Sequence, residues 1–143
     1  MRLFLDANVL FSAAHNPGGR AATLFALARA GRCGLVTSPH ALTEARRNLQ
    51  LEYPDRMTTL ASLEATITVG LEATPESAVW AHEAGLPPND APILAAAVQA
   101  RADVLVTGDR THFGHLFERR VRGVEVVTPA EALRRVLARP RRS

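Results

Sequence analysis

Four acidic residues of this chain could together hold a metal ion, although they are far apart in the sequence: Asp6, Glu44, Asp90 and Asp109. Asp6 is the most unusual, because it ends the apolar run Leu3-Phe4-Leu5, where a charge is costly to desolvate unless it has a partner. Converging carboxylates repel one another and raise each other's pKa. A hard divalent cation relieves that repulsion, and oxygen-only ligation with no His or Cys cluster favours Mg²⁺ or Mn²⁺ over zinc. Such ions bind substrate phosphates and can activate a water molecule for phosphodiester cleavage.

Predicted strands and helices alternate along the chain. Apolar runs predict strands at residues 2–6, 33–37, 67–72, 103–107 and 124–127. Apolar patterning and end signals predict helices at residues 9–15, 19–30, 39–51, 54–65, 74–84, 90–101 and from 129 onward. Strands separated by helices indicate an α/β fold, here a single three-layer α/β/α domain whose mainly parallel sheet is covered on both faces.

This topology predicts where the four acids lie. In open α/β sheets, functional sites form outside the carboxyl ends of the strands. Asp6 and Asp109 follow two strands, whereas Asp90 and Glu44 lie near the starts of helices that leave the same edge. We therefore expect all four carboxylates at one edge of the sheet. Asp103 starts the strand that Asp109 follows, so at ~3.3 Å per residue it should lie roughly 20 Å away, at the opposite edge.

Length and composition indicate one globular domain, which we place at residues 1–138. The chain has 143 residues, of which 47% are apolar, enough for one hydrophobic core. No run approaches the ~18 consecutive apolar residues of a spanning helix, so no membrane association is expected. The N-terminus has no signal-peptide pattern, which makes a cytoplasmic location the expectation. Cys33 is the only cysteine, which excludes an internal disulfide framework and a cysteine-rich zinc site.

Positive charge is concentrated at the C-terminal end. All 17 basic residues are arginine, and residues 119–143 contain eight of them with only two acids, a net charge of +6. The preceding 118 residues carry nine arginines and twelve acids, a net charge of −3. A basic terminal segment suggests a polyanionic partner, which makes five arginines candidate nucleic-acid contacts: Arg134, Arg135, Arg139, Arg141 and Arg142. The alternative is a solvated helix face followed by a disordered basic tail at residues 139–143.

Several motifs resemble the PIN-domain family, in particular the VapC-like ribonuclease toxins of bacterial toxin–antitoxin pairs. They are LDANVLFSA near the N-terminus, the helix that carries Glu44, PPNDAPILAAAVQARADVLVTGD and the closing VVTPAEAL. The resemblance extends from residue 2 to about residue 137, and its specificity comes from the ordered set of motifs. Two positions depart from the family pattern, because Ala7 replaces a hydroxyl residue and Asn89 stands where many members have a further acid.

The resemblance implies a metal-dependent endoribonuclease that acts on single-stranded or structured RNA with Mg²⁺ or Mn²⁺. It carries over the four acids as the catalytic, metal-binding quartet: Asp6, Glu44, Asp90 and Asp109. Asn8 and Thr107 occupy the positions that support Asp6 and Asp109. A cognate antitoxin protein and a second copy of the chain, forming a homodimer, are the protein partners that the resemblance implies.

Each of the four acids also has a purely structural interpretation. Asp6 could cap the turn after its strand, and Asp90 could serve only as a helix N-cap. Asp109, in the sequence Thr-Gly-Asp-Arg, could be an ordinary turn residue. Glu44 could form a surface ion pair with Arg47, three residues further along the predicted helix.

Two further residues receive structural interpretations. His112 follows Asp109 by three residues and could touch a phosphate, but we interpret it as a solvated loop residue. Thr128-Pro129-Ala130-Glu131 has capping-box spacing, so the Glu131 carboxylate is expected to serve its own helix.

Three other functions share some of these features. A haloacid-dehalogenase-type phosphatase also places an aspartate after the first strand, but it needs an acid at position 8, which is asparagine here. A phospho-acceptor receiver domain requires an early acidic pair and a late lysine, and this chain has no lysine. A PIN-like module that binds RNA or a partner without cutting would carry a broken quartet, whereas this quartet is intact. Bound Mn²⁺ would distinguish the enzyme from the binding module.

Overall fold

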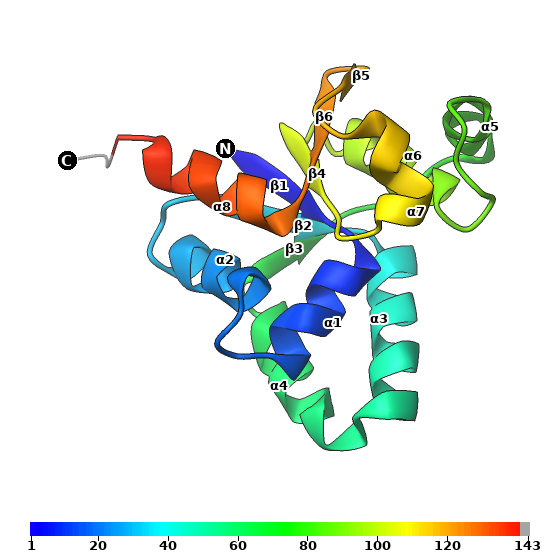
Figure 1. Cartoon of the computed structure of the whole chain (residues 1–143). Helices are drawn as coiled ribbons and strands as arrows, with labels where there is room; N and C mark the ends of the chain where they lie inside the picture. Colours follow the sequence, from blue (N-terminus) through cyan, green and yellow to red (C-terminus); the bar gives the residue numbers. More distant parts are fainter. Residues whose placement is uncertain (141–143) are drawn as a thin grey trace.

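A six-stranded sheet forms the centre of the computed structural model, which describes residues 1–140 (Figure 1). The strands are β1 (Arg2–Leu5), β2 (Gly34–Thr37), β3 (Ile67–Val69), β4 (Val104–Val106), β5 (Arg120–Val121) and β6 (Val124–Val127). Their order is β3-β2-β1-β4-β6-β5, and every neighbouring pair is parallel except β5 with β6. The predicted mainly parallel α/β sheet is confirmed, with one short antiparallel strand at its edge.

Helices cover both faces of this sheet. They are α1 (Ala7–His15), α2 (Arg20–Arg29), α3 (Pro39–Glu52), α4 (Met57–Glu64), α5 (Pro75–Glu83), α6 (Ala91–Gln99), α7 (Arg110–Phe113) and α8 (Pro129–Ala138), with short 3₁₀ helices at Pro54–Arg56 and Gly114–Leu116. α6 and α8 pack against β4 from opposite faces, with α5 beside α6 and α2 beside α8 (Figure 1). Within residues 1–140, no helix combines the length and the apolar character needed to cross a membrane.

Local signals in the sequence account for three of the helix starts. The side-chain oxygens of Ser38, Thr74 and Thr128 each accept a hydrogen bond from the backbone amide three residues further on, at 3.1–3.2 Å. A proline follows each of these caps at the first helical position, where the missing N–H would have had no partner within the helix. These starts agree with the prediction.

The two central strands are buried on both faces. Residues Leu3–Leu5 of β1 and all three residues of β4 are at most 2% exposed. Their unbroken apolar runs, without the alternation of a half-exposed strand, are typical of a parallel sheet covered by helices. Next to them, Ile93–Ala97 of α6 is equally buried. This packing fixes the carboxyl ends of β1 and β4, from which the segments carrying Asp6 and Asp109 leave the sheet.

The structure differs from the predicted elements in four places. The helix predicted at 54–65 is divided, because Pro54 starts a 3₁₀ helix and α4 begins only at Met57. The strand predicted at 67–72 ends at Val69, and α1 begins at Ala7, directly after the residue that caps it. Residues 108–123, for which no element is predicted, contain α7, the second 3₁₀ helix and β5.

Candidate active site

The four predicted acids lie around one cavity at the carboxyl edge of the sheet. The cavity has a volume of about 520 Å³, and its lining includes Asp6, Glu44, Asp90 and Asp109. They come from four separate segments: the end of β1, the second turn of α3, the start of α6 and the start of α7. By contrast, Asp103 lies at the opposite edge, where its Oδ2 accepts a hydrogen bond of 2.6 Å from the backbone amide of Arg2. The structure thus brings together the four residues that the topology predicts.

Asp6 is almost fully buried, with an exposed fraction of 4%. Its Oδ1 accepts a hydrogen bond from the Ala7 amide at 2.7 Å, which caps α1. Its Oδ2 accepts hydrogen bonds from the Thr107 hydroxyl at 2.7 Å and from the Asn8 amide at 3.1 Å. Burial raises the pKa of Asp6 to about 6, and neighbouring carboxylates add to the rise while the hydrogen bonds oppose it. Asp6 does cap a helix, but capping involves only one of its two oxygens.

Asn8 and Thr107 connect the ends of β1 and β4. The Asn8 side chain donates to the Thr107 hydroxyl at 3.2 Å, and its oxygen accepts from the Gly108 amide at 2.9 Å. The Thr107 hydroxyl also accepts from the Asp109 amide at 3.1 Å. With its donation to Asp6, this hydroxyl uses its one hydrogen and both lone pairs. The network fixes Asp6 and the main chain of Asp109 relative to each other.

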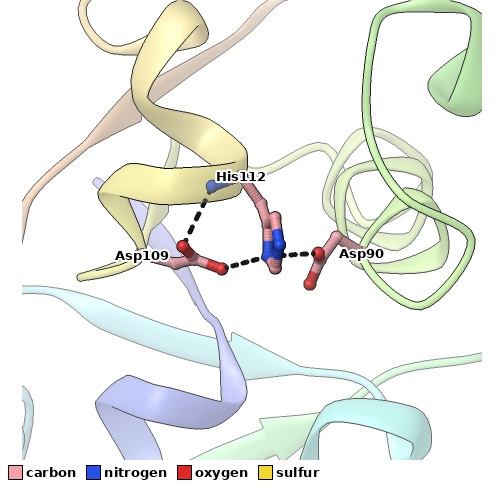
Figure 2. Close-up of side chains that lie close together, drawn as sticks. All are labelled: Asp90, Asp109 and His112. Carbon is pink, nitrogen blue, oxygen red and sulfur yellow. Dashed lines mark hydrogen bonds and ion pairs between the residues drawn. The ribbon is translucent and has the colours of Figure 1, made fainter.

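Asp90 and Asp109 flank the imidazole ring of His112 (Figure 2). The Nδ1 atom of His112 lies 2.8 Å from Oδ2 of Asp109 and 3.0 Å from Oδ2 of Asp90. Burial raises the pKa of Asp90. The neighbouring carboxylates of Asp109 and Glu44 raise this pKa further, whereas His112 lowers it. Each of the three side chains in Figure 2 offers one ligand atom, and these atoms lie within 4.8 Å of one another. The arrangement can therefore hold a metal ion.

The structural interpretations do not account for these acids. Asp90 occupies the N-cap position of α6 but makes no capping hydrogen bond with its side chain. Asp109 caps α7 through Oδ1, which accepts from the His112 amide at 3.0 Å, and its Oδ2 is left to contact the His112 ring. Glu44 also lines the cavity, and none of the ion pairs formed within residues 1–140 includes it, so the surface pair with Arg47 is absent.

His112 is the residue that sequence reasoning missed. Its interpretation as a loop residue is wrong, because it lies within α7. Its side chain is solvated, as expected, with 47% of its surface exposed, but the ring also contacts both aspartates. The available signal was its spacing from Asp109, since an N-cap residue and the residue three positions later meet in the first turn of a helix. Its contact with Asp90 joins different segments, so no local pattern predicts it. The expected oxygen-only cluster therefore also contains a nitrogen donor.

Two of the arginines predicted to contact nucleic acid form ion pairs on the surface of α8. Arg134 pairs with Glu131, and Arg135 pairs with both Glu131 and Glu125. The Glu131 carboxylate thus serves its helix through these ion pairs, whereas the capping hydrogen bond comes from Thr128. Both guanidinium groups already have carboxylate partners, which reduces the positive charge that this helix presents.

The C-terminal tail follows α8. Arg139 ends the helix, and Pro140 is the last residue that the structure describes. Residues 141–143, which include Arg141 and Arg142, lie outside the described residues. Disorder of the tail and its contact with nucleic acid remain predictions.

The sequence and the fold correspond to a known family. The sequence profile of the PIN domain matches residues 2–111, which is most of the chain. The chain therefore belongs to the PIN-domain family. A comparison with curated protein sequences finds no match.

Solved structures of toxin–antitoxin systems share the fold. Rickettsia felis VapBC2, bound to a DNA fragment from its promoter, is 16% identical with a TM-score of 0.65, covering 90% of this chain and 98% of that one. A toxin–antitoxin complex from Klebsiella pneumoniae is 24% identical with a TM-score of 0.63, covering 89% and 97%. Mycobacterium tuberculosis VapC20, a toxin that cleaves the sarcin-ricin loop, is 18% identical with a TM-score of 0.57, covering 84% and 97%. At these identities the likeness concerns the fold, so activity has to be argued from the site.

Proposed function

We propose that the protein is an endoribonuclease that hydrolyses RNA phosphodiester bonds with Mg²⁺ or Mn²⁺ as its cofactor. The observation that carries this proposal is the convergence of Asp6, Glu44, Asp90 and Asp109 from four segments on one cavity. Among the described residues that line the cavity, no arginine balances these four carboxylates. Carboxylates gathered without a cationic side chain are typical of a site for a hard divalent cation.

The donor set fits such an ion. A carboxylate offers about four lone-pair positions, and Asp6 uses three of them in hydrogen bonds, so one remains for the cavity. Asp90 and Asp109 both direct Oδ2 toward the position where the His112 nitrogen lies. A bound ion would orient a substrate phosphate and lower the pKa of an attacking water molecule. We assign Asp6, Glu44, Asp90 and Asp109 as the residues that hold it.

Other parts of the chain position these groups and favour an anionic substrate. Asn8 and Thr107 hold the Asp6 carboxylate through two hydrogen bonds, so it cannot turn away from the cavity. The N-termini of α1 and α6 lie at the cavity, because Asp6 and Asp90 precede them directly. The partial positive charge at a helix N-terminus stabilises carboxylates and phosphates. Both helix N-termini therefore stabilise the carboxylates and favour a substrate phosphate at the cavity.

We further propose that this ribonuclease is the toxin of a toxin–antitoxin pair. The proposal is supported by membership of the PIN family and by a fold shared with toxins solved in such complexes. It implies an antitoxin protein as a partner and allows a homodimer, as the family resemblance suggests. Expression of the native chain, but not of Asp90→Asn, should then stop growth of a bacterial host. Unhindered growth with abundant native protein would contradict the toxin proposal.

RNA cleavage in vitro tests the nuclease itself. End-labelled single-stranded and hairpin RNAs are incubated with the protein in Mg²⁺, in Mn²⁺ and in EDTA. Cleavage should require the ion and should be lost in Asp90→Asn. The matched control is Glu83→Gln, which neutralises an exposed carboxylate at the end of α5 and should cleave like the native chain. Cleavage that persists in EDTA or in Asp90→Asn would refute the proposal, and RNA binding without cleavage would favour a PIN-like binding module.

A further inference from the structure

His112 holds a position between two of the proposed metal ligands that is fixed by its own main chain. Its backbone amide donates to Oδ1 of Asp109, so the first turn of α7 holds the ring beside Asp109 and Asp90. The ring nitrogen Nδ1 then lies 2.8 Å from Asp109 and 3.0 Å from Asp90, measured to Oδ2 of each (Figure 2). The Asp109 residue thus contacts His112 through both carboxylate oxygens.

The separations around Nδ1 are those of neighbouring ligands on one metal ion. Two ligands at right angles around an ion with bonds of ~2.1 Å lie roughly 3.0 Å apart. The two measured distances from Nδ1 to the carboxylate oxygens, 2.8 and 3.0 Å, agree with this value. A single ring nitrogen carries at most one hydrogen, so one hydrogen bond accounts for its contact with only one of the two carboxylates. The geometry points to His112 as a metal ligand through Nδ1, alongside Asp90 and Asp109.

A nitrogen ligand would determine which ion the site prefers. Mg²⁺ favours oxygen ligands and retains water, whereas imidazole is a good ligand for transition metals, with Mn²⁺ the weakest binder of the first-row series. His112 therefore makes the site selective for Mn²⁺ over Mg²⁺. To bind the ion, Nδ1 must be unprotonated, so the ring hydrogen is on Nε2 in the bound form and any second proton is released to solvent. This inference rests on the proposed function, because it concerns the same metal site.

A second histidine near the cavity provides a matched control. His40, in the first turn of α3, already contacts the Asn89 carbonyl through Nε2 at 3.1 Å. Its backbone amide donates to Glu72 at 2.9 Å. His40 thus resembles His112 in type and neighbourhood, but its ring is engaged elsewhere. We expect no contribution of His40 to ion binding.

Calorimetric titration of the full chain with Mn²⁺ alone and with Mg²⁺ alone tests the selectivity. In His112→Gln, the Mn²⁺ affinity should fall by at least ~10-fold, while the Mg²⁺ affinity should change less than about twofold. The loss of a residue that only hydrogen-bonds to a metal ligand already reduces metal affinity by ~10-fold, so the loss of a ligand should reduce it at least as much. His40→Gln should retain both native affinities. Equal losses for the two ions in His112→Gln, or none, would overturn the inference.

Pulsed electron paramagnetic resonance of the Mn²⁺-loaded chain tests the bond directly. Spin-echo modulation from a ¹⁴N nucleus should be present in the native protein and in His40→Gln, and absent in His112→Gln. Native protein labelled with ¹⁵N-histidine should lose the ¹⁴N pattern, and this measurement needs no variant. If Mn²⁺ binds and Asp90→Asn abolishes the binding, but nitrogen modulation is absent, the inference fails and the proposed function stands. If the native chain binds Mg²⁺ but not Mn²⁺, the inference alone fails, and if it binds neither ion, both fail.

Discussion

Two groups of carboxylates in this protein have opposite surroundings. In the cavity, Asp6 and Asp90 lie among other acids, and burial raises the pKa of both, that of Asp6 to about 6. On α8, hydrogen bonds from Arg134 and Arg135 lower the pKa of Glu131 to about 2. We call the second group the α8 cluster, which consists of Glu125, Glu131, Arg134 and Arg135. Acids with arginine partners stabilise the fold, whereas acids without them are available to an ion.

The largest difference between the groups should appear in catalysis. Asp6→Asn, Asp90→Asn and Asp109→Asn should each reduce RNA cleavage by at least ~10²-fold, because each removes charge that holds the ion. Glu44→Gln should lose as much or somewhat less. Glu131→Gln, in the α8 cluster, should stay within about threefold of the native rate. Initial rates at saturating Mn²⁺ and RNA give these values, and full activity of Asp90→Asn would remove that residue from the site.

The pH dependence of stability should have opposite signs in the two groups. The folded-state pKa of Asp6, about 6, lies above its ordinary value of 3.8, so protonated Asp6 stabilises the fold. In metal-free protein this contribution is fully present below about pH 4 and is lost as the pH rises through 6, a total of up to about 3 kcal/mol. For Glu131 the pKa is lowered to about 2, so its contribution is present above about pH 4.5 and is lost as the pH falls toward 2.

Urea denaturation in EDTA from about pH 2 to pH 8 measures this contrast. The free energy of unfolding of the native chain should fall relative to that of Asp6→Asn as the pH rises, because the asparagine does not ionise. Glu131→Gln should differ from the native chain most above pH 4.5. Parallel curves for the native chain and Asp6→Asn would show that the buried Asp6 carboxylate has an ordinary pKa.

Neutralising Asp90 should stabilise the metal-free protein. Its raised pKa means that the ionised form is disfavoured in the fold, and its side chain makes no capping bond that the substitution would remove. Asp90→Asn should therefore raise Tm in EDTA by about 2–6 °C, corresponding to ~0.5–2 kcal/mol. Saturating Mn²⁺ should narrow or reverse the difference, because it stabilises the native chain by mass action. A lower Tm for Asp90→Asn in EDTA, with equal Mn²⁺ shifts in both proteins, would indicate a purely structural Asp90.

Removal of the basic tail should change RNA binding modestly. Deleting residues 139–143 removes three arginines, so the slope of log affinity against log salt should decrease by up to ~0.7 for each RNA phosphate that the protein no longer neutralises. Asp90→Asn serves as the background, because it prevents cleavage during the measurement. Filter binding at several KCl concentrations gives the slope. An unchanged slope would indicate that the tail is solvated and does not touch RNA.

The smallest effect belongs to the exposed ion pair of the α8 cluster. The Arg134 side chain is 68% exposed, and an exposed pair contributes little to stability. Arg134→Gln should therefore change Tm by less than about 2 °C, and by less still in high salt. Thermal melting at low and high ionic strength checks this, and a larger shift would mean that the cluster stabilises the fold more than surface pairs do.

The elements that could be predicted from the sequence are those with local signals. The buried runs of β1 and β4 directly indicate strands, and the Ser38, Thr74 and Thr128 caps mark three helix starts. In the segment from Gly108 to Gly123, Asp109 caps α7, but α7 has four residues and β5 has two, too few to show a periodic pattern. Such short elements depend on packing against the rest of the molecule, so a single sequence does not reveal them.

The same distinction applies to the candidate site. The topology of a parallel sheet predicts that Asp6 and Asp109 share an edge, and the structure places both there. The contact between His112 and Asp90 joins the start of α7 to the start of α6, two segments separated by all of β4. Only tertiary packing creates this contact, which is why the sequence alone predicts a solvated His112. The edge can thus be predicted from the sequence, whereas the His112 donor is found only in the folded structure.

The hydrogen bonds of Asn8 with Thr107 and Gly108 have a consequence for the synthesis of the chain. They join residues that are about 100 positions apart in the sequence, and they can form only after β4 has paired with β1. A ribosome adds residues in order, and contacts between distant positions form late. A nascent chain that ends before β4 therefore lacks Asp109 and the strand that positions it. The complete site therefore exists only when most of the protein has been translated.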